Sequence, residues 1–481
     1  MQAIHRTIIR LVLLLSVLLF QTGIARTEPD EPPREQTGTQ GMTYYVAPTG
    51  SDTYPGTEAW PWRTIQKAAN TLVAGETVFI KAGTYPERVV PLNSGSTGNY
   101  IVYAAYPGDT ATIDGSSVTL PNDLAGLFDV SNKSYIRISG LRVVNAGPYA
   151  DNAAILVNDS SHIIIENNNT YNTVSSGIGV WGSDHVTVAG NEVELANTDI
   201  WQECISLAST DTFEIRDNRV HNCQEEGICV KDGATNGQVY RNRIYDVHAT
   251  GLYVDAWDKH TYNIEVFQNV VYDVSANAFA VASETGGTLE NVRIYNNIAY
   301  HNRFCGISVS VNGPGDAQGR HPMQNIYVIN NTFYDHGWED WGGGIVIENA
   351  DARNLVVRNN ICSQNLYFQI AVDPGVLAAN ITVDHNLIDG YRGTEGEIYG
   401  DDYVEGDPLF VNPSEADFHL QGNSPAVDQG SAVNAPADDY DGHFRPQDGD
   451  QDGTAGYDIG AYEVVAYSEH IYLPLVQKGG W

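Results

Sequence analysis

The stretch "GICVKDGATNGQVYRNRIYDVHATGLYV", residues 227–254, decides the fold of this chain of 481 residues. It begins with the short strand pattern GICV and ends with GLYV, and each alternates between two faces with a period of two residues. Between them, Asn242 opens an "N-x-apolar" signature. Gly227 and Gly251 lie 24 residues apart, so the stretch contains one complete sequence repeat.

The same repeat extends in both directions along the chain. Further strand patterns are GIGV (177–180), CISL (204–207) and GIVI (344–347). The signature asparagines, most of them 22 to 29 residues apart, are Asn169, Asn191, Asn218, Asn242, Asn269, Asn297, Asn331, Asn360 and Asn386. A unit of this length without a helix cannot bury its apolar face alone, so we expect the units to stack into a solenoid of coils. The asparagines would then form an internal ladder, with neighbours about 4.8 Å apart.

The repeats resemble those of the right-handed parallel β-helix proteins of the pectate-lyase-like superfamily. The opening segment, residues 44–89, resembles the first strand, the short capping helix and the first coil of such proteins. Four apolar residues at helical spacing would cover one end of the core: Ile65, Ala68, Ala69 and Leu72. The resemblance extends over about residues 43–390 and implies an all-β, right-handed parallel β-helix with an N-terminal helical cap. It does not choose a reaction, because this superfamily includes lyases, hydrolases, epimerases and adhesins.

The N-terminal residues predict export. Residues 1–25 are expected to be a signal peptide, because basic residues such as Arg6 and Arg10 precede a short apolar run. Residues 26–42 are expected to be a flexible polar leader. We therefore expect a secreted protein, and no later segment is apolar and long enough to span a membrane.

The regular repeat is lost after residue 390. Residues 391–463 are expected to form an irregular closing segment, followed by a tail at 464–481. Three aspartates match the opening of a calcium-binding loop: Asp448, Asp450 and Asp452. Ile459 occupies the twelfth position, where such loops carry a glutamate, so a solvated acidic turn is the alternative interpretation.

The charge of the chain restricts its partners. The chain has 60 Asp and Glu residues against 25 Lys and Arg residues, and its net charge of -35 opposes binding to nucleic acid or to an anionic membrane. Five cysteines are too few for a disulfide framework. Cys204, Cys223 and Cys229 permit a bridge whose pairing the sequence does not choose, and small buried side chains are the simpler interpretation. We expect a monomer.

Alignment of the strand patterns predicts one column of outward side chains on successive coils. The column reads Asn158, Trp181, Ala208, Lys231, Asp255, Ala282, Ser310, Glu348 and Asp373. Small residues flank a Lys–Asp pair, which predicts a trough with a charged centre. Glu203 and Glu226, 23 residues apart, each precede a strand, so we expect them to stack on adjacent coils. Two carboxylates at that spacing repel unless they share a proton or a cation.

The strand "GLYVDAWDKH", residues 251–260, ends in a cluster of charge around a tryptophan. We expect this end to form one wall of the trough, where Asp255 and Asp258 supply negative charge. Six residues are predicted to bind substrate: Trp181, Trp257, Lys259, His260, Glu284 and Arg303. A surface salt-bridge cluster, with Trp257 packed on a neighbouring turn, is the alternative.

The charged trough favours a lyase that cleaves a uronic-acid polysaccharide by β-elimination. Such a reaction needs a cation that neutralises the uronate and a base that removes a proton. Lys231 or Lys259 would be the base, and we expect its pKa to be lowered by burial or by Ca2+. Calcium would be the cation, held by Glu203, Glu226, Asp232, Asp255 and Asp258. The chain also resembles the family-nine pectate lyases, in which an aspartate cluster binds calcium and a lysine is the base, and this resemblance implies the role of base for Lys231.

Two further hypotheses remain open. A glycoside hydrolase would use a carboxylate pair, Glu203 with Glu226 or Glu226 with Asp255, on a neutral glycan and would need no metal. A glycan-binding or cell-surface solenoid would have grooves but no turnover. The concentration of ionisable residues between 203 and 303 argues against the second of these.

Overall fold

The computed structural model describes residues 41–199, 202–338 and 341–465. The chain divides into two units, Met1–Gly38 and Thr39–Trp481, and all described residues belong to the second. The expected signal peptide (1–25), most of the leader (26–42) and nearly all of the tail (464–481) lie outside the described residues.

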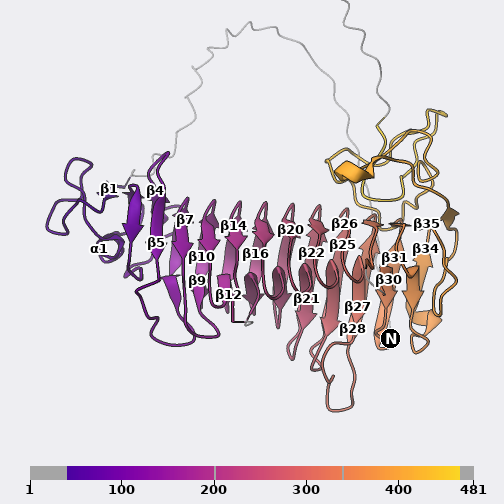
Figure 1. Ribbon diagram of the computed structural model, residues 1–481, viewed down its shortest axis with the longest axis horizontal. Coiled ribbons are helices and arrows are strands. Elements are labelled where there is room, and N and C mark those ends of the chain that lie inside the picture. The colour runs from indigo at the N-terminus through magenta and orange to yellow at the C-terminus, as the bar shows by residue number, and fades with distance from the viewer. Residues whose placement is uncertain (1–40, 200–201, 339–340, 466–481) are drawn as a thin grey trace, which may run out of the picture. The chain divides into compact units, whose positions relative to one another are not determined.

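The described residues form three parallel sheets, and from β6 to β33 each coil contributes one strand to each sheet (Figure 1). Sheet A contains β1 (Thr43–Val46), β2 (Thr77–Ile80), β4 (Ile101–Ala105), β7 (Ser134–Ser139), β10 (Ser161–Glu166), β13 (Asp184–Ala189), β16 (Asp211–Arg216), β19 (Thr235–Tyr240), β22 (Thr261–Phe267), β25 (Leu289–Tyr295), β28 (Met323–Ile329), β31 (Ala352–Arg358) and β34 (Ile381–Asp384).

Sheet B contains β3 (Gly83–Tyr85), β5 (Ala111–Asp114), β8 (Arg142–Val144), β11 (Asn169–Tyr171), β14 (Glu192–Glu194), β17 (Arg219–His221), β20 (Arg243–Tyr245), β23 (Val270–Tyr272), β26 (Ile298–Tyr300), β29 (Thr332–Tyr334), β32 (Ile361–Ser363), β35 (Leu387–Asp389) and β36 (Val404–Glu405). Sheet C contains β6 (Gly126–Asp129), β9 (Ala153–Asn158), β12 (Ser176–Trp181), β15 (Ile205–Ala208), β18 (Ile228–Lys231), β21 (Leu252–Ala256), β24 (Phe279–Ser283), β27 (Ile307–Ser310), β30 (Gly343–Ile347) and β33 (Phe368–Val372). The predicted all-β parallel solenoid is confirmed.

The core lies inside the coils, where the inward positions of all three sheets are apolar. Ile228, Val230 and Val254 are typical of it, since none exposes more than 1% of its surface. Successive side chains of a strand point alternately into and out of the coil. The parallel register then stacks the inward residues of one coil on those of the next. This continuous stack explains why units of about 24 residues fold only together.

An internal asparagine ladder runs along the turn between sheets A and B. Its members expose at most 2% of their surface, and each of the first eight donates from Nδ2 to Oδ1 of the next, at 2.9–3.0 Å. They are Asn168, Asn191, Asn218, Asn242, Asn269, Asn297, Asn331, Asn360 and Asn386.

The predicted ladder is confirmed at eight positions and wrong at the first, where Asn168 takes the place expected of Asn169. Asn169 instead donates to Glu192 outside the core, at 3.2 Å. Residues 167–169 are three consecutive asparagines, and a shift of one residue moves a strand side chain to the opposite face.

Two segments cover the coils. The short helix α1 (Ile65–Ala69) buries Ile65, Ala68 and Ala69, as the helical spacing predicts. The closing segment contains the antiparallel strands β37 (Phe410–Asn412) and β38 (Asp417–Leu420), with the short 3-10 helix η2 (Pro413–Glu415) between them. A second short 3-10 helix, η1 (Ala378–Asn380), precedes the closing segment. Apolar residues of the closing segment, including Phe418 and Ile459, pack on the outer face of sheet B. In the part of the chain that the structure describes, no helix is long and apolar enough to cross a bilayer.

Candidate active site

The outer face of sheet C carries the predicted column of side chains. Ala208 pairs with Trp181 on one side and with Lys231 on the other, and Asp255 pairs with Ala282. Val230 pairs with Val254, so Lys231 and Asp255 follow a matched position on adjacent strands. The predicted register is therefore confirmed.

This face is covered, although its residues point outward from the coils. Asp255 exposes 4% of its surface and Ala282 exposes none. Side chains from the turns between sheets C and A reach back over the face: Tyr253 Oη donates to Glu284 Oε1 at 2.5 Å, and Asn312 Nδ2 donates to Tyr253 Oη at 3.0 Å. We use the name trough for this partly covered outer face of β15, β18, β21 and β24 and the turn side chains beside it.

Lys231 forms a tight ion pair with Glu203 across two adjacent coils. Its Nζ donates to Glu203 Oε1 at 2.7 Å and Oε2 at 2.9 Å, and to Gln202 Oε1 at 2.8 Å. Burial alone would lower the pKa of Lys231, but the Glu203 carboxylate, followed by Cys229 and Asp255, raises it above the ordinary value. We expected a lysine with a lowered pKa, and that expectation is wrong, because the neighbouring carboxylates outweigh desolvation.

Glu226 lies close enough to this ion pair for the charge of Glu203 to act on it. Cys204 N donates to the Glu226 carbonyl at 2.9 Å, so Glu203 and Glu226 occupy equivalent places on adjacent coils, as predicted. Burial, and then the charges of Glu203 and Glu225, raise the pKa of Glu226 to about 7. The raised pKa of Glu226 thus lies beside a glutamate that is ion-paired with Lys231.

Asp255 lies beside them on β21. Burial, followed by the charge of Glu284, raises its pKa well above the usual range. Its Oδ2 accepts a weak bond from Cys229 Sγ at 3.6 Å, and its Oδ1 is buried with no hydrogen-bond partner among the described residues. A buried polar atom without a partner is costly, and the raised pKa of Asp255 favours the neutral carboxyl, which avoids burying a charge there.

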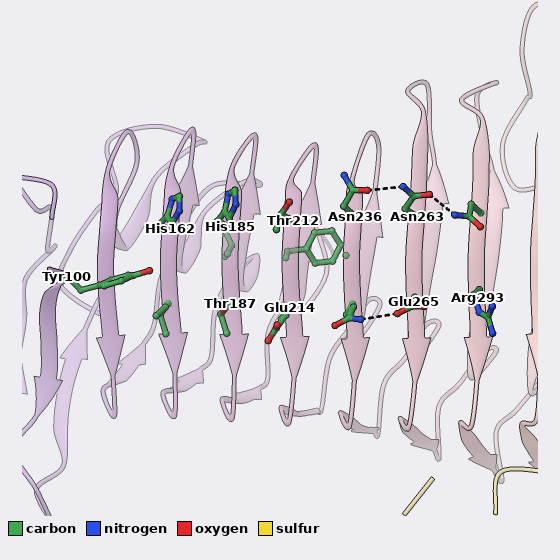
Figure 2. Close-up of a pocket in the computed structure, with 16 residues that line it drawn as sticks. Tyr100, His162, His185, Thr187, Thr212, Glu214, Asn236, Asn263, Glu265 and Arg293 are labelled. Atoms are coloured by element: carbon green, nitrogen blue, oxygen red, sulfur yellow. Dashed lines mark hydrogen bonds between the residues drawn. The ribbon is translucent and has the colours of Figure 1, made fainter. Parts of the chain in front are cut away.

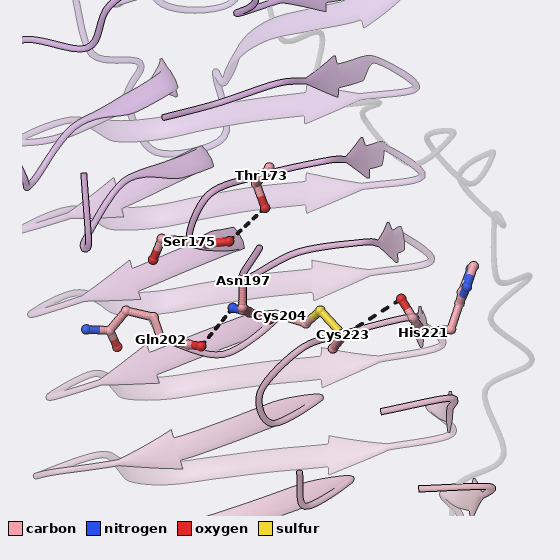
Figure 3. The surroundings of a disulfide bond; sticks show 7 residues. All are labelled: Thr173, Ser175, Asn197, Gln202, Cys204, His221 and Cys223. Carbon is pink, nitrogen blue, oxygen red and sulfur yellow. Dashed lines mark hydrogen bonds between the residues drawn. A yellow bond between two sulfur atoms is a disulfide. The ribbon is translucent and has the colours of Figure 1, made fainter. Parts of the chain in front are cut away.

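A disulfide holds the backbone that carries both glutamates (Figure 3). Cys204 and Cys223, whose Cα atoms are 6.1 Å apart, form the bridge that the sequence left open. Cys204 directly follows Glu203, and Cys223 lies three residues before Glu226. Cys229, Cys305 and Cys362 are buried and unbridged in the part of the chain that the structure describes.

The remaining predicted wall residues form a separate cluster at the turns between sheets C and A. Lys259 Nζ donates to Asp232 Oδ2 at 2.6 Å, and the backbone of Asp258 donates to Asp232 Oδ1 at 3.3 Å. His260 pairs with Glu290 at 2.9 Å, and Trp257 is 54% exposed. The structure therefore brings Glu203, Glu226, Lys231 and Asp255 together with Glu284, and places Asp232, Asp258, Lys259, His260 and Trp257 in a surface cluster at the rim.

Two predicted binding residues lie at the ends of the trough. Trp181 folds over Gly179 of its own strand, where a Cβ would lie 2.4 Å from the indole ring. Arg303 lies on a turn between sheets B and C, and its guanidinium stacks on Phe304 with 5.2 Å to the ring centroid. Trp181 can still offer its outer ring face to a sugar.

The carboxylates of the trough do not converge as calcium ligands would. Among the described residues, two groups of three ligand side chains have their atoms within 4.8 Å of one another: His162, Asp184 and His185, and Asp428, Asp448 and Asp450. Neither group includes a residue of the trough. The second joins two of the predicted calcium ligands to Asp428, which the sequence interpretation missed, and leaves out Asp452.

Sequence reasoning also missed three residues of the trough: Gln202, Tyr253 and Asn312. Tyr253 had a detectable signal, because it is the one large residue in a column whose neighbours are Ser206, Cys229 and Ala280. Gln202 and Asn312 lie on turns outside the repeat, where the period gives no register.

Comparison with known proteins agrees with this fold. Residues 44–308 match the family model described as the Pel9A-like, right-handed β-helix region. The uncharacterized protein YwoF of Bacillus subtilis (strain 168) is 26% identical over 444 residues, which cover 80% of this chain and 92% of that protein. Pectate lyase PEL9 of Emericella nidulans is 27% identical over 225 residues, and the match spans about half of that enzyme, 49%, and 44% of this chain.

Solved structures show the same fold. Pectate lyase Pel9A superposes with a TM-score of 0.51 at 17% identity, over 88% of this chain and 96% of that one. A lacto-N-biosidase from Eubacterium ramulus has a TM-score of 0.50 at 12% identity, over 73% and 68% of the two chains. The resemblance inferred from the repeats is confirmed, and because the family model covers more than half of the sequence, this chain belongs to the Pel9A-like right-handed β-helix family.

Proposed function

We propose that the protein is a secreted enzyme that hydrolyses an uncharged polysaccharide in the trough of sheet C. The observation that carries this proposal is the difference between two stacked glutamates. Glu203 is ion-paired with Lys231, whereas burial and neighbouring charge raise the pKa of Glu226 to about 7. Two carboxyl groups whose environments separate their protonation states are the requirement for an acid and a carboxylate in glycoside cleavage.

The proposed chemistry assigns one role to each residue. Glu226 donates its proton to the glycosidic oxygen as the bond breaks, and Glu203 attacks the anomeric carbon to form a glycosyl ester. Glu226, now ionised, then removes a proton from water, which hydrolyses the ester and restores both groups. Lys231 holds the Glu203 carboxylate in place through the ion pair.

The spacing of the coils supports a retaining reaction. Adjacent coils place the two glutamates about 4.8 Å apart along the stack. Retaining enzymes separate their carboxyl groups by about 5–5.5 Å, and inverting enzymes by roughly 6.5–9.5 Å. The acidic trough and the net charge of -35 favour an uncharged substrate.

A Ca2+-assisted lyase is the second candidate function. The family and the relative described as a pectate lyase favour it. Bound Ca2+ would supply positive charge that acidifies a uronate C5 proton. The trough fits this less well, because its carboxylates do not converge and Lys231, the proposed base, is held protonated by Glu203.

Two further features support export and a calcium ion elsewhere. A disulfide persists in an oxidising compartment, so the Cys204–Cys223 bridge supports secretion. We propose a structural Ca2+ in the closing segment with Asp428, Asp448 and Asp450 as ligands, supported by their convergence and by the buried, unpartnered Asp448 Oδ1.

The test is incubation with a panel of uncharged and uronic-acid polysaccharides, with and without a chelator. We expect new reducing ends without ultraviolet-absorbing products, unaffected by the chelator in the short term. Unsaturated products that form only in the presence of Ca2+ would contradict the hydrolase and support the lyase. Binding of a polysaccharide without product formation from any member of the panel would identify a glycan-binding protein without turnover.

A further inference from the structure

We propose that a groove on the outer face of sheet A is a second binding site, which takes an uncharged glycan chain lying along the stack of coils. The groove has a volume of about 580 Å3 and extends from Tyr100 across β10, β13, β16, β19 and β22 to Arg293 on β25 (Figure 2). Its volume falls in the range of about 300–1,000 Å3 that ligand sites occupy. The trough lies on sheet C, so this groove is separate from the proposed catalytic residues.

The first rim of the groove is a column of residues in the left-handed region, with φ between 52° and 57°. The strand register skips each of them, as it skips His185 between the paired positions Asp184 and Val186. Six of them line the groove: His162, His185, Thr212, Asn236, Asn263 and Asn291. Asn263 donates to Asn236 at 2.8 Å and Asn291 donates to Asn263 at 2.6 Å, and these bonds hold a row of amides at the surface (Figure 2).

The second rim is a register column of the same sheet. It contains Thr187, Glu214, Gln238, Glu265 and Arg293, paired from strand to strand. Gln238 Nε2 donates to Glu265 Oε2 at 2.9 Å. The floor between the rims contains Gly237, whose missing side chain leaves room for the Phe213 ring; a Cβ there would lie 1.9 Å from Phe213 Cζ.

From β13 to β25, the two rims offer at least one hydroxyl, amide or carboxylate group on each coil. Such groups donate to and accept from sugar hydroxyls, and they repeat about every 4.8 Å, close to the length of one sugar residue in an extended glycan. At one end, Tyr135, His162 and His185 stack with 4.4 Å between successive ring centroids and border the groove with flat ring edges and faces. The regular spacing of polar groups suits a repeating polymer.

Charge selects an uncharged chain. Glu214 and Glu265 both line the groove, and Arg293 is the cation at its far end. Arg216 forms an ion pair with Glu214 at 3.1 Å and offsets part of its charge. A polyuronate would still meet the Glu214 and Glu265 carboxylates in the middle of the groove, within a protein of net charge -35. A second contact of this kind would hold a long polysaccharide to the protein while another part of it occupies the trough.

The test is affinity electrophoresis in gels that contain xyloglucan, galactomannan or polygalacturonate. The protein carries Glu226→Gln throughout, so that any turnover in the trough does not consume the polymer. We expect retardation by at least one of the uncharged polymers and none by polygalacturonate. The variant Glu214→Ala/Gln238→Ala should bind at least tenfold more weakly, while Gln324→Ala/Arg353→Ala, on the same sheet beyond the groove, should bind as before.

Equal retardation of the groove variant and its control would overturn the proposal, as would the absence of retardation by every uncharged polymer. If the double variant melts at a lower temperature than its control, Thr187→Trp, which fills the groove without removing a hydrogen-bonding pair, replaces it and carries the same expectation. Failure of the groove proposal can be distinguished from failure of the proposed hydrolysis, because binding is measured in a protein that lacks the proposed acid, Glu226.

Discussion

The ammonium of Lys231 donates to both carboxylate oxygens of Glu203, at 2.7 and 2.9 Å, from the next coil of sheet C. This contact makes two otherwise equivalent glutamates different. Glu203 has a cation beside it, whereas Glu226, one coil away, has Glu203 and Glu225 as its strongest charged neighbours. The ion pair at Glu203 and the raised pKa of Glu226 thus distinguish two glutamates that occupy equivalent places on adjacent coils.

Glu226→Gln should lower turnover by roughly 10²- to 10⁴-fold, the scale of a lost general acid. Glu225→Gln keeps the proposed acid and is the comparison; it should retain turnover in mildly acidic solution, because loss of the Glu225 charge only lowers the pKa of Glu226. Retained turnover in Glu226→Gln, measured as new reducing ends, would refute the assigned role.

Stability of the same variant should depend on pH in a defined direction. The folded-state pKa of Glu226, about 7, is above its ordinary value of 4.5, so the stability associated with its neutral form is present below pH 4.5 and is lost as the pH rises through 7. Glu226→Gln should therefore match the wild type at pH 4 and exceed it by roughly 2–3 kcal/mol at pH 8. Urea denaturation at the two pH values measures this difference, and a constant difference would contradict it.

Wild-type turnover should decline as the pH rises above about 7, because Glu226 then loses the proton that it donates. A pH–rate profile of kcat/KM measures this limb. An activity that instead increases up to pH 9 would indicate a base that must first lose a proton, as Lys231 would in the lyase.

Lys231→Met should destabilise the protein by about 3 kcal/mol at pH 7, because it leaves the largely buried Glu203 carboxylate unpaired. Lys231→Arg preserves the ion pair and should lose much less. Thermal melts at pH 7 compare the three proteins, and an unaltered melting temperature of Lys231→Met would show that the ion pair is dispensable.

Asn269→Ala should cost about 2–3 kcal/mol, since it removes a fully buried amide and leaves groups on both neighbouring coils without partners. Asn169→Ala, outside the ladder, is the matched control and should cost less than about 0.5 kcal/mol. Chemical denaturation of both variants tests the assignment of the ladder, and the reverse order would restore Asn169 to it.

Calcium should raise the melting temperature through the closing segment. Stabilisation by a bound ion reaches about 2.7 kcal/mol at a hundredfold excess over its dissociation constant. Asp428→Asn and Asp448→Asn should abolish this response to Ca2+, and Asp452→Asn should preserve it. A response that survives loss of Asp428 would place the ion elsewhere.

The period of the sequence predicts the coils, the register of sheet C and the stacking of Glu203 on Glu226, because each coil repeats the same strand and turn. Lys231 and Asp255 were found in this way. The period carries no information about turns of irregular length, so it did not reveal that Gln202 joins the Lys231 ion pair or that Asn312 reaches Tyr253.

Protonation was harder to predict than position. Burial and nearby carboxylates shift the pKa of a lysine in opposite directions, and the sequence does not give their relative size. The expectation of a depressed Lys231 pKa counted the burial and left out Glu203. The sequence also missed one ligand of the proposed calcium site. Asp428 lies 20 residues before Asp448, and only the fold of the closing segment brings the two together.

The asparagine ladder has a consequence for how chains of this kind change in length. Each buried amide donates to the coil after it and accepts from the coil before it, so every coil presents the same pair of contacts to its neighbours. A whole coil inserted between two others would reproduce both contacts, whereas a cut partway through a coil would break them. The coil is therefore the unit in which such a chain can be lengthened or shortened, and the distance between subsites along its faces changes in whole steps.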